Sequence, residues 1–228
     1  MAIAGSNILV IGANGALGQQ ISNLLMQRGA TVVGTARTNE TASTLPASLA
    51  QALLLDLESQ QSIDTLVSYL ASAPQQLDGV VIASGLVAFG SVAETPAAVA
   101  ERLMQVNHLA PAKVIAGLAQ KLSTSTNEPF VASISGVVAE KVFPGMAAYV
   151  TSKTAHSTWL TAFALEARRA GIRVVDARPG HTETGLAGRA IFGTAPAFAQ
   201  GMTAEHVAKV IVDGIEAGLK DIPSEAFA

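Results

Sequence analysis

The sequence predicts an α/β fold in one domain, with a doubly wound parallel sheet flanked by helices. Short apolar runs that end in turn residues alternate with segments of helical periodicity along the whole chain, a pattern typical of parallel sheets. A glycine-rich turn follows the first of these runs. The 228 residues, half of them hydrophobic and 14 % charged, are enough to bury one sizeable core.

Six apolar runs have the composition of buried strands. They are residues 7–12, 30–36, 52–56, 79–84, 130–135 and 172–177. The helical segments begin near Ala16, Ser59, Pro96, Ala110, Met146 and Thr203. No repeat or linker divides the chain, so we expect a single domain over residues 1–228. Residues 184–200 mix Gly, Ala and Phe without a clear period, and we expect a short substrate loop there; a mobile lid and an ordinary surface loop both fit this composition.

Composition argues against several classes of function. The net charge is −3 and the Lys and Arg residues are scattered, so we expect no nucleic-acid partner. The absence of cysteine excludes disulfides and thiolate catalysis, and the four histidines lack metal-ligand spacing, so no metal site is expected. No stretch approaches the roughly 20 apolar residues of a membrane span. The N-terminus has no basic segment before its apolar run, and a cytoplasmic location is expected.

The glycine-rich turn lies between the first strand and the first helix. Small residues at such a turn let backbone amides and the positive end of a helix approach a pyrophosphate, which predicts dinucleotide binding. The residues expected to contact the dinucleotide here are Gly12, Asn14, Gly15, Ala16, Leu17 and Gly18.

The end of the second strand bears on the choice of cofactor. No carboxylate stands there to bind the ribose hydroxyls of NAD, whereas Arg37, with Thr38 beside it, suits a 2′-phosphate, so NADP(H) is expected in preference to NAD(H). Asp56, followed by Leu57, can accept a hydrogen bond from the adenine amino group or cap the next helix, and both readings stay open.

Tyr149 and Lys153 lie one helical turn apart, a spacing that places an ammonium beside a phenol. Hydride transfer to a carbonyl carbon leaves an alkoxide, which must take up a proton, and Tyr149 can donate it. Alcohol oxidation needs the phenol as a base instead. Lowering its pKa by two to three units takes about 3 to 4 kcal/mol, which the Lys153 ammonium and a positive nicotinamide can supply together.

Several stretches together resemble the ordered motifs of the short-chain dehydrogenase/reductase family. They are "GANGALG" (12–18), "LLLDLES" (53–59), "IASG" (82–85), "VNHLAP" (106–111), "YVTSK" (149–153) and "RPGHTET" (178–184). The resemblance implies a Rossmann-type fold and NAD(P)(H)-dependent interconversion of a small carbonyl compound and its alcohol. It also implies a homodimer or homotetramer that packs through the helices near Ala110 and Tyr149.

The resemblance assigns further roles. Asn107 shapes a helix kink and holds a water that links Lys153 to solvent. Additional contacts to the cofactor are implied for Ala83, Ser84, Gly85, Tyr149, Lys153, Pro179, Gly180, Thr182 and Thr184.

The chain departs from the family where the catalytic serine is expected. The position thirteen residues before Tyr149 is Gly136. Ser135 precedes it, and we take Ser135 as the catalytic candidate, although neighbouring side chains of a strand point to opposite faces and Ser135 reaches the site only if the strand end bends. Ser84, His181 and Thr182 are alternative donors. Losing one oxyanion donor costs about 10² to 10³ in rate.

Ile82 and Ala83 replace the asparagine pair of the family. The favoured hypothesis is an NADP(H)-dependent oxidoreductase for a small, mostly uncharged substrate, with Tyr149 as acid and base. The alternative is a non-catalytic NADP(H) sensor or regulatory protein, which the missing serine favours but the retained Tyr149 does not. A cofactor-independent lyase on this fold is less favoured, because the chain keeps Lys153 and the glycine-rich turn.

Overall fold

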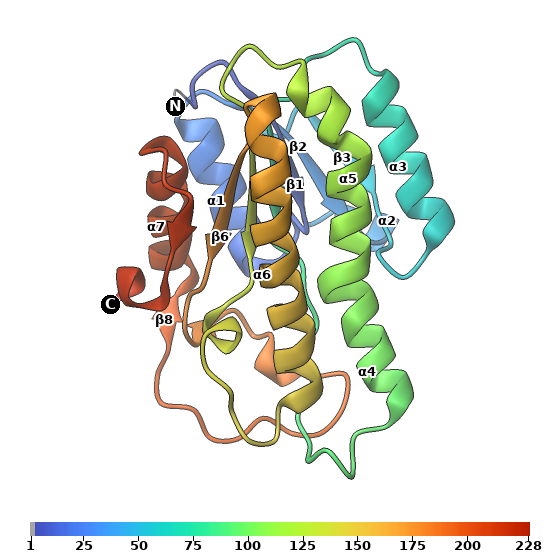
Figure 1. Ribbon diagram of the computed structural model, residues 1–228, viewed down its shortest axis with the longest axis vertical. Helices are drawn as coiled ribbons and strands as arrows, with labels where there is room; N and C mark the ends of the chain where they lie inside the picture. Colours follow the sequence, from blue (N-terminus) through green and yellow to red (C-terminus); the bar gives the residue numbers. More distant parts are fainter. Residues whose placement is uncertain (1–2) are drawn as a thin grey trace.

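A seven-stranded, all-parallel sheet forms the centre of the computed structural model, which describes residues 3–228 (Figure 1). Met1 and Ala2, part of the expected domain, lie outside the described residues. The strand order is β3-β2-β1-β4-β5-β6-β9, and helices cover both faces. The predicted doubly wound α/β fold is therefore confirmed.

The six expected strands are present, each within a few residues of its predicted bounds. They are β1 (Asn7–Ile11), β2 (Thr31–Ala36), β3 (Gln51–Leu54), β4 (Gly79–Ile82), β5 (Phe130–Ile134) and β6 (Arg173–Ala177). The seventh strand, β9 (Asp221–Ile222), was not expected, because two residues are too few to produce a pattern. A separate two-stranded sheet pairs β7 (Thr182–Glu183) with β8 (Met202–Thr203).

The helices also begin where the sequence predicts. They are α1 (Ala16–Gln27), α3 (Gln60–Ser72), α4 (Ala97–Met104), α5 (Ala110–Ser123), α6 (Ala147–Ala167) and α7 (Ala204–Glu216). Ser59 and Thr203 cap α3 and α7, because each side chain accepts a hydrogen bond from the backbone amide three residues later. The polar connection after β2 contains one unexpected turn, α2 (Asn39–Ala42).

Alternating strand residues supply two apolar layers, one on each face of the sheet. Leu9 and Val80 face α3, α5 and α6, whereas Val10 and Val81 face α1 and α7. Figure 1 shows α1 and α7 together on one side and α3, α5 and α6 on the other. Burial on both faces explains why the strands are continuous apolar runs.

The strand order reverses between β1 and β4, which are neighbours although far apart in sequence. The register pairs Ile11 with Ile82, so the turns that follow the two strands lie side by side. A Cβ added at Gly12 would lie 3.0 Å from the Cβ of Ser84. Ligands of open α/β sheets bind outside the carboxyl ends of the strands at such a switch point.

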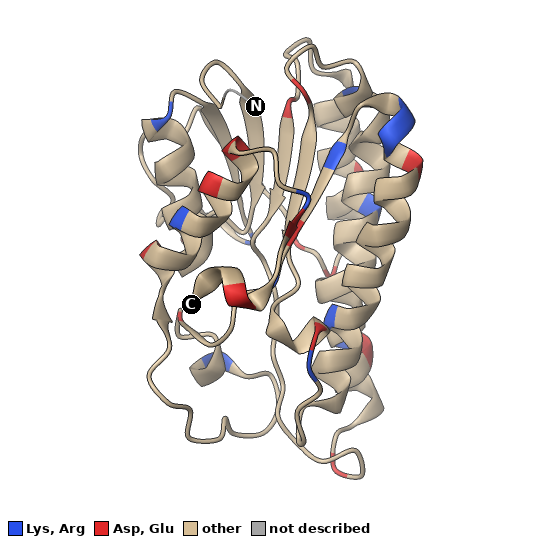
Figure 2. Ribbon diagram, turned by 60° about the vertical axis from the view of Figure 1, so that its left-hand side comes forward, with Lys and Arg blue, Asp and Glu red and all other residues tan. Residues whose placement is uncertain are grey.

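Charged residues are interspersed over the molecule. Figure 2 shows acidic and basic residues mixed along helices and strands rather than gathered in a region of one sign. None of the helices in residues 3–228 has the length and apolar character needed to span a bilayer. The same residues contain no group of three or more His, Cys, Asp or Glu placed to hold a metal ion.

Candidate active site

Lys153 is held by the end of the neighbouring strand. Its Nζ, on the second turn of α6, donates a hydrogen bond of 2.7 Å to the carbonyl oxygen of Ile134, the last residue of β5. The side chain is buried, and burial lowers the pKa of Lys153 to about 8, against the opposing effect of the Asp176 carboxylate. At neutral pH Lys153 therefore carries its charge.

Tyr149 lies one turn earlier on α6 and is partly buried. Burial raises the pKa of Tyr149 to about 12, since a phenolate is disfavoured away from water. In the protein without cofactor the phenol is thus protonated throughout the physiological range. A phenol with this pKa can donate a proton near neutral pH but is not ionised there, so it cannot accept one.

Asn107 joins three parts of the site. It lies in a π-helical segment, Gln105–Leu109, that links α4 to α5, an irregularity frequent at functional sites. Its side chain accepts a hydrogen bond from the Leu86 amide (2.8 Å) and donates to the Leu86 carbonyl (2.9 Å) and to Ser152 Oγ (2.9 Å). A Cβ added at Gly85 would lie 3.3 Å from Asn107 Oδ1 and 3.4 Å from Lys153 Nζ. Asn107, Gly85 and Lys153 are therefore neighbours.

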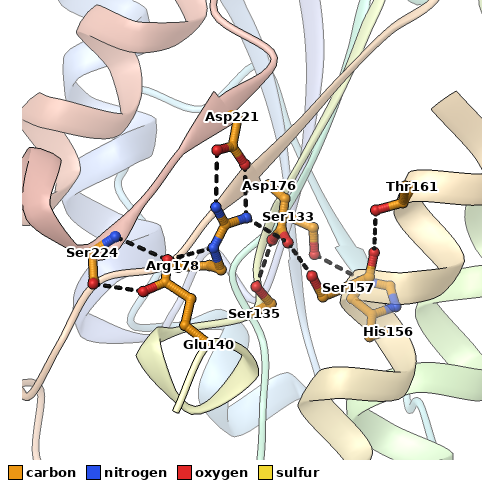
Figure 3. Close-up of polar contacts among 10 residues, drawn as sticks. All are labelled: Ser133, Ser135, Glu140, His156, Ser157, Thr161, Asp176, Arg178, Asp221 and Ser224. Carbon is orange, nitrogen blue, oxygen red and sulfur yellow. Dashed lines mark hydrogen bonds and ion pairs between the residues drawn. The ribbon is translucent and has the colours of Figure 1, made fainter.

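The structure directs Ser135 to an acidic residue. Its buried hydroxyl donates a hydrogen bond of 2.6 Å to Oδ1 of Asp176 on β6 (Figure 3). This bond uses the hydroxyl proton, so in this conformation Ser135 does not serve as a donor to a substrate oxygen. The strand end does bend, at Gly136, whose φ of 82° and ψ of 165° leave the extended region, so the condition set for Ser135 is met. The bend nevertheless leaves Ser135 on Asp176.

Asp176 belongs to a polar network that the sequence reasoning missed (Figure 3). Its Oδ2 accepts hydrogen bonds from Ser157 of α6 (2.5 Å) and from Arg178 (3.2 Å). Arg178 also pairs with Glu140 at 2.6 Å and with Asp221 of β9 at 2.7 Å. The one indication of this network in the sequence was the carboxylate of Asp176 inside the apolar run 172–177. The network ties the loop before α6 to the last strand of the sheet.

His156 has a structural place beside the network (Figure 3). Its Nε2 lies 2.9 Å from Ser133 Oγ, and its ring stacks against that of Trp159. Burial, assisted by the charge of Lys153, lowers the pKa of His156 to about 3. The imidazole is therefore neutral and does not titrate near pH 7.

A cleft of about 420 Å³ runs from the β1–β4 switch point across the ends of β2 and β3. The predicted cofactor residues that line it are Gly12, Asn14, Arg37, Asp56, Leu57, Ser84 and Gly85. The first amides of α1 have no side-chain cap. The Ser84 hydroxyl is buried without a hydrogen-bond partner in the structure. These two features leave donors for a phosphate or a ribose.

Two predicted adenosine-side residues have local structural roles. Thr38 caps α2, because its Oγ1 accepts a hydrogen bond from the amide of Thr41 (3.2 Å). Asp56 accepts a hydrogen bond from the amide of Glu58 (3.0 Å) in the turn before α3, which leaves its second oxygen for a ligand. The cap of α3 is Ser59, so the capping interpretation of Asp56 was wrong. Arg37 lines the cleft and is exposed.

The lining of this cleft does not include four residues after β6 that were also predicted to bind cofactor, namely Pro179, Gly180, Thr182 and Thr184. Pro179 accepts a hydrogen bond from the Val137 amide (2.9 Å), which places it beside the end of β5 together with Gly180. Thr182 donates to the Gly180 carbonyl (3.0 Å), and Thr184 accepts from the Leu186 amide (3.3 Å).

The alternative oxyanion donors are mostly occupied. Thr182 is bonded as above, and His181 lies 3.4 Å from Glu183 and stacks on Phe198. The remaining alternative to Ser135 is Ser84, whose buried hydroxyl has no hydrogen-bond partner in the structure.

The loop over residues 184–200 is fixed to the chain that follows β4. The Ile191 amide donates to the Val87 carbonyl and the Phe89 amide to the Phe192 carbonyl, both at 2.9 Å. The ring of Phe89 also lies 6.1 Å from that of Phe198. The loop thus lies beside the chain that leaves the carboxyl end of β4, and its contact with a substrate stays a prediction.

Comparison with known proteins identifies relatives of one family. Residues 6–192 match the family model of the short chain dehydrogenases. The glycine betaine reductase ATRR of Emericella nidulans is 27 % identical over 222 residues, which cover 92 % of this chain but only 17 % of that much longer relative. The uncharacterized oxidoreductase YmfI of Bacillus subtilis is 27 % identical, with 78 % of this chain and 75 % of the relative covered.

A third relative, the 1-hydroxy-2-glutathionyl-2-methyl-3-butene dehydrogenase of Rhodococcus sp., is 26 % identical, with 79 % of this chain and 80 % of its own length covered. Among solved structures, a short chain dehydrogenase of Burkholderia cenocepacia in complex with NADP superposes with a TM-score of 0.85 at 19 % identity, over 98 % of this chain and 90 % of the other. A short-chain dehydrogenase of Sphingobium yanoikuyae in complex with NADPH gives a TM-score of 0.85 at 22 % identity, over 96 % and 87 %.

Proposed function

The chain belongs to the short-chain dehydrogenase family, and from this we propose that it is an NADP(H)-dependent oxidoreductase that interconverts a small, mostly uncharged carbonyl compound and its alcohol. One observation carries the proposal. Lys153 is anchored on the Ile134 carbonyl and adjoins Gly85 and Asn107 at the end of β4, with Tyr149 one turn away. A protein that only bound nucleotide would have no need of the tyrosine.

In this proposal the reaction divides between the cofactor and the chain. Bound NADP(H) supplies or accepts the hydride. Tyr149 donates its phenolic proton to the alkoxide oxygen in reduction and takes the proton back in oxidation. Lys153 keeps an ammonium near the phenol and lowers the free energy of the phenolate. Asn107 holds the backbone of Leu86 and the hydroxyl of Ser152, and thereby fixes α6 against the end of β4.

The residues of the cleft suit NADP(H). Arg37 has no carboxylate within ion-pair distance among residues 3–228, so its charge is available to a 2′-phosphate. The uncapped start of α1 and the unpartnered Ser84 hydroxyl supply donors for the diphosphate and a ribose. Two similar structures were determined with NADP or NADPH, which supports the same preference here.

We infer the substrate preference from the two segments that pair at the end of β4. The aromatic rings of Phe89, Phe192 and Phe198 come from the two segments that pair over the end of β4, and they favour an apolar substrate. With Ser135 bonded to Asp176 and Gly136 without a side chain, the substrate oxygen has fewer donors than usual. We therefore expect modest turnover on unactivated ketones and better turnover on diketones.

We also propose that the protein forms a homodimer or homotetramer and is located in the cytoplasm.

The test is a titration of the purified protein with NADPH and with NADH, followed by fluorescence. A panel of small ketones and diketones is then added while the absorbance of the reduced cofactor is recorded. We expect tighter binding of NADPH, and oxidation of NADPH that Tyr149→Phe abolishes while nucleotide binding is retained. Binding without turnover on every substrate would favour the sensor instead, and no binding of either nucleotide would rule out both functions.

A further inference from the structure

Three arginines line the cleft proposed for the cofactor, and they differ in their partners. Arg102 is neutralised by Glu58 through two hydrogen bonds of 2.8 Å each, and this pair forms part of the wall. Arg37 and Arg189 have no carboxylate within ion-pair distance among the described residues. Two arginines without a close ion-pair partner in one cleft can each bind an anionic group of its ligand.

The position of Arg189 separates it from Arg37. The chain is pinned two residues later, where the Ile191 amide donates to the Val87 carbonyl. Arg189 therefore lies near the chain that leaves the carboxyl end of β4 and lines the same cleft as Gly12 and Ser84, whereas Arg37 follows β2, on the adenosine side of the cleft. The diphosphate of a dinucleotide lies at the switch point, above β1 and β4.

The local backbone directs the Arg189 side chain. Its Nη2 reaches the Thr184 carbonyl at a long 3.4 Å, its one hydrogen bond to the described protein. The guanidinium lies against Gly185, where an added Cβ would come within 2.8 Å of Nη1. In this position the guanidinium occupies the space that a side chain at residue 185 would take. The guanidinium thus sits in the cleft with most of its five donors unused.

We propose that Arg189 binds the diphosphate of the dinucleotide from the loop side, opposite the amides of the glycine-rich turn. The proposal rests on the proposed nucleotide-binding function. In this arrangement the anion is held between the sheet and the loop, so cofactor binding stabilises the position in which residues 184–200 cover the site. Arg37 binds the 2′-phosphate, and the two arginines contribute to different parts of the cofactor.

The experiment compares Arg189→Gln with Arg37→Gln in direct titrations with NADPH and NADH at fixed ionic strength. The diphosphate is common to both nucleotides, so Arg189→Gln is expected to raise both dissociation constants by about tenfold or more. Arg37→Gln is expected to weaken NADPH binding alone. Arg169→Gln, which removes an exposed arginine on the turn after α6, is the matched control and should change neither. Thermal melts of each variant confirm an intact fold.

Other outcomes would overturn the assignment. If Arg189→Gln weakened only NADPH binding, Arg189 would belong to the 2′-phosphate. If both dissociation constants stayed unchanged while the KM of the ketone rose, the arginine would belong to the substrate site. Failure of the wild-type protein to bind either nucleotide would instead contradict the proposed function, and it would be seen before any variant is made.

Discussion

Gly136 stands at the position where the family resemblance places a catalytic serine, and its backbone conformation disfavours a serine there. With φ at 82° and ψ at 165°, it occupies a region that is essentially restricted to glycine. Space is not the obstacle, since the nearest atom to an added Cβ would be the Pro179 oxygen at 3.7 Å. The obstacle is the backbone conformation.

Gly136→Ser is therefore expected to destabilise the protein by about 1 to 3 kcal/mol, and Gly136→Ala by a similar amount. Because the bent strand end has to change for either residue, we expect no gain in turnover from the added hydroxyl. Thermal melts and steady-state kinetics on a diketone measure both effects. A Ser variant that outperformed both the Ala variant and the wild type would contradict this expectation and would indicate that the added hydroxyl restores a donor whose absence limits the wild-type site.

The two titrating groups of α6 predict opposite pH profiles for the two directions. Tyr149, with a pKa near 12 before cofactor binds, is protonated from pH 6 to 9, so the donor for reduction is always present. Lys153 loses its charge as pH rises through about 8. Reduction should be flat from pH 6 to 7.5 and decline above 8, whereas oxidation, which needs the phenolate, should rise with pH. A reduction rate that rose steadily between pH 6 and 8 would exclude these assignments.

At the scale of elements, the loop over the site depends on one close backbone contact. Gly193 has φ 68°, and an added Cβ would lie 1.8 Å from the Phe89 carbonyl oxygen. Gly193→Ala should break the pairing between Phe89 and Phe192 and raise the KM of the ketone severalfold, with little change in melting temperature because the loop lies outside the core.

Gly188→Ala is the matched control for this loop, since no atom lies within 4 Å of an added Cβ there. It should behave as wild type in both kinetics and melting. Equal kinetics for the two variants would mean that the pairing of the loop with residues 87–89 does not matter for catalysis.

The elements were largely predictable, because buried parallel strands and amphipathic helices leave strong apolar patterns. The strand β9 was missed since two residues leave no pattern, and its place depends on Arg178 and Asp221 meeting in the folded chain. The same limit applies within the site. Tyr149 and Lys153 are visible as a spacing, whereas the direction of the Ser135 hydroxyl is set by Asp176, which is 41 residues away in sequence.

At the scale of the whole molecule, Arg178 joins the last strand to the rest of the sheet through Glu140, Asp176 and Asp221. Its own pKa is raised, chiefly by hydrogen bonding to Asp221. Arg178→Gln leaves three carboxylates near one another and is expected to cost about 2 to 4 kcal/mol at pH 7. Arg28→Gln removes more exposed ion pairs with Asp213 and Glu216 and should cost less.

The stability difference between the wild type and Arg178→Gln should depend on pH in a direction that the Glu140 carboxyl sets. Hydrogen bonds from Ser224 and Arg178 outweigh burial and lower the pKa of Glu140, so its contribution to stability is present above its ordinary pKa and is lost as pH falls through the lowered value. The gap in melting temperature between wild type and Arg178→Gln should therefore narrow as the pH is lowered from 7 to below 4. A gap independent of pH would show that the network acts by packing rather than by charge.

The pairing of β1 with β4 also sets an order of events during synthesis. One edge of β1 can pair with β2 early, but its other edge has to wait for Ile82, about 70 residues after Ile11. At ribosomal rates of about 5–20 residues per second, that open edge persists for roughly 4 to 14 seconds. During this interval the apolar strand of Ile8, Leu9 and Val10 is a template for pairing with another nascent chain. The switch point that provides the nucleotide cleft is thus also where the growing polypeptide most needs protection.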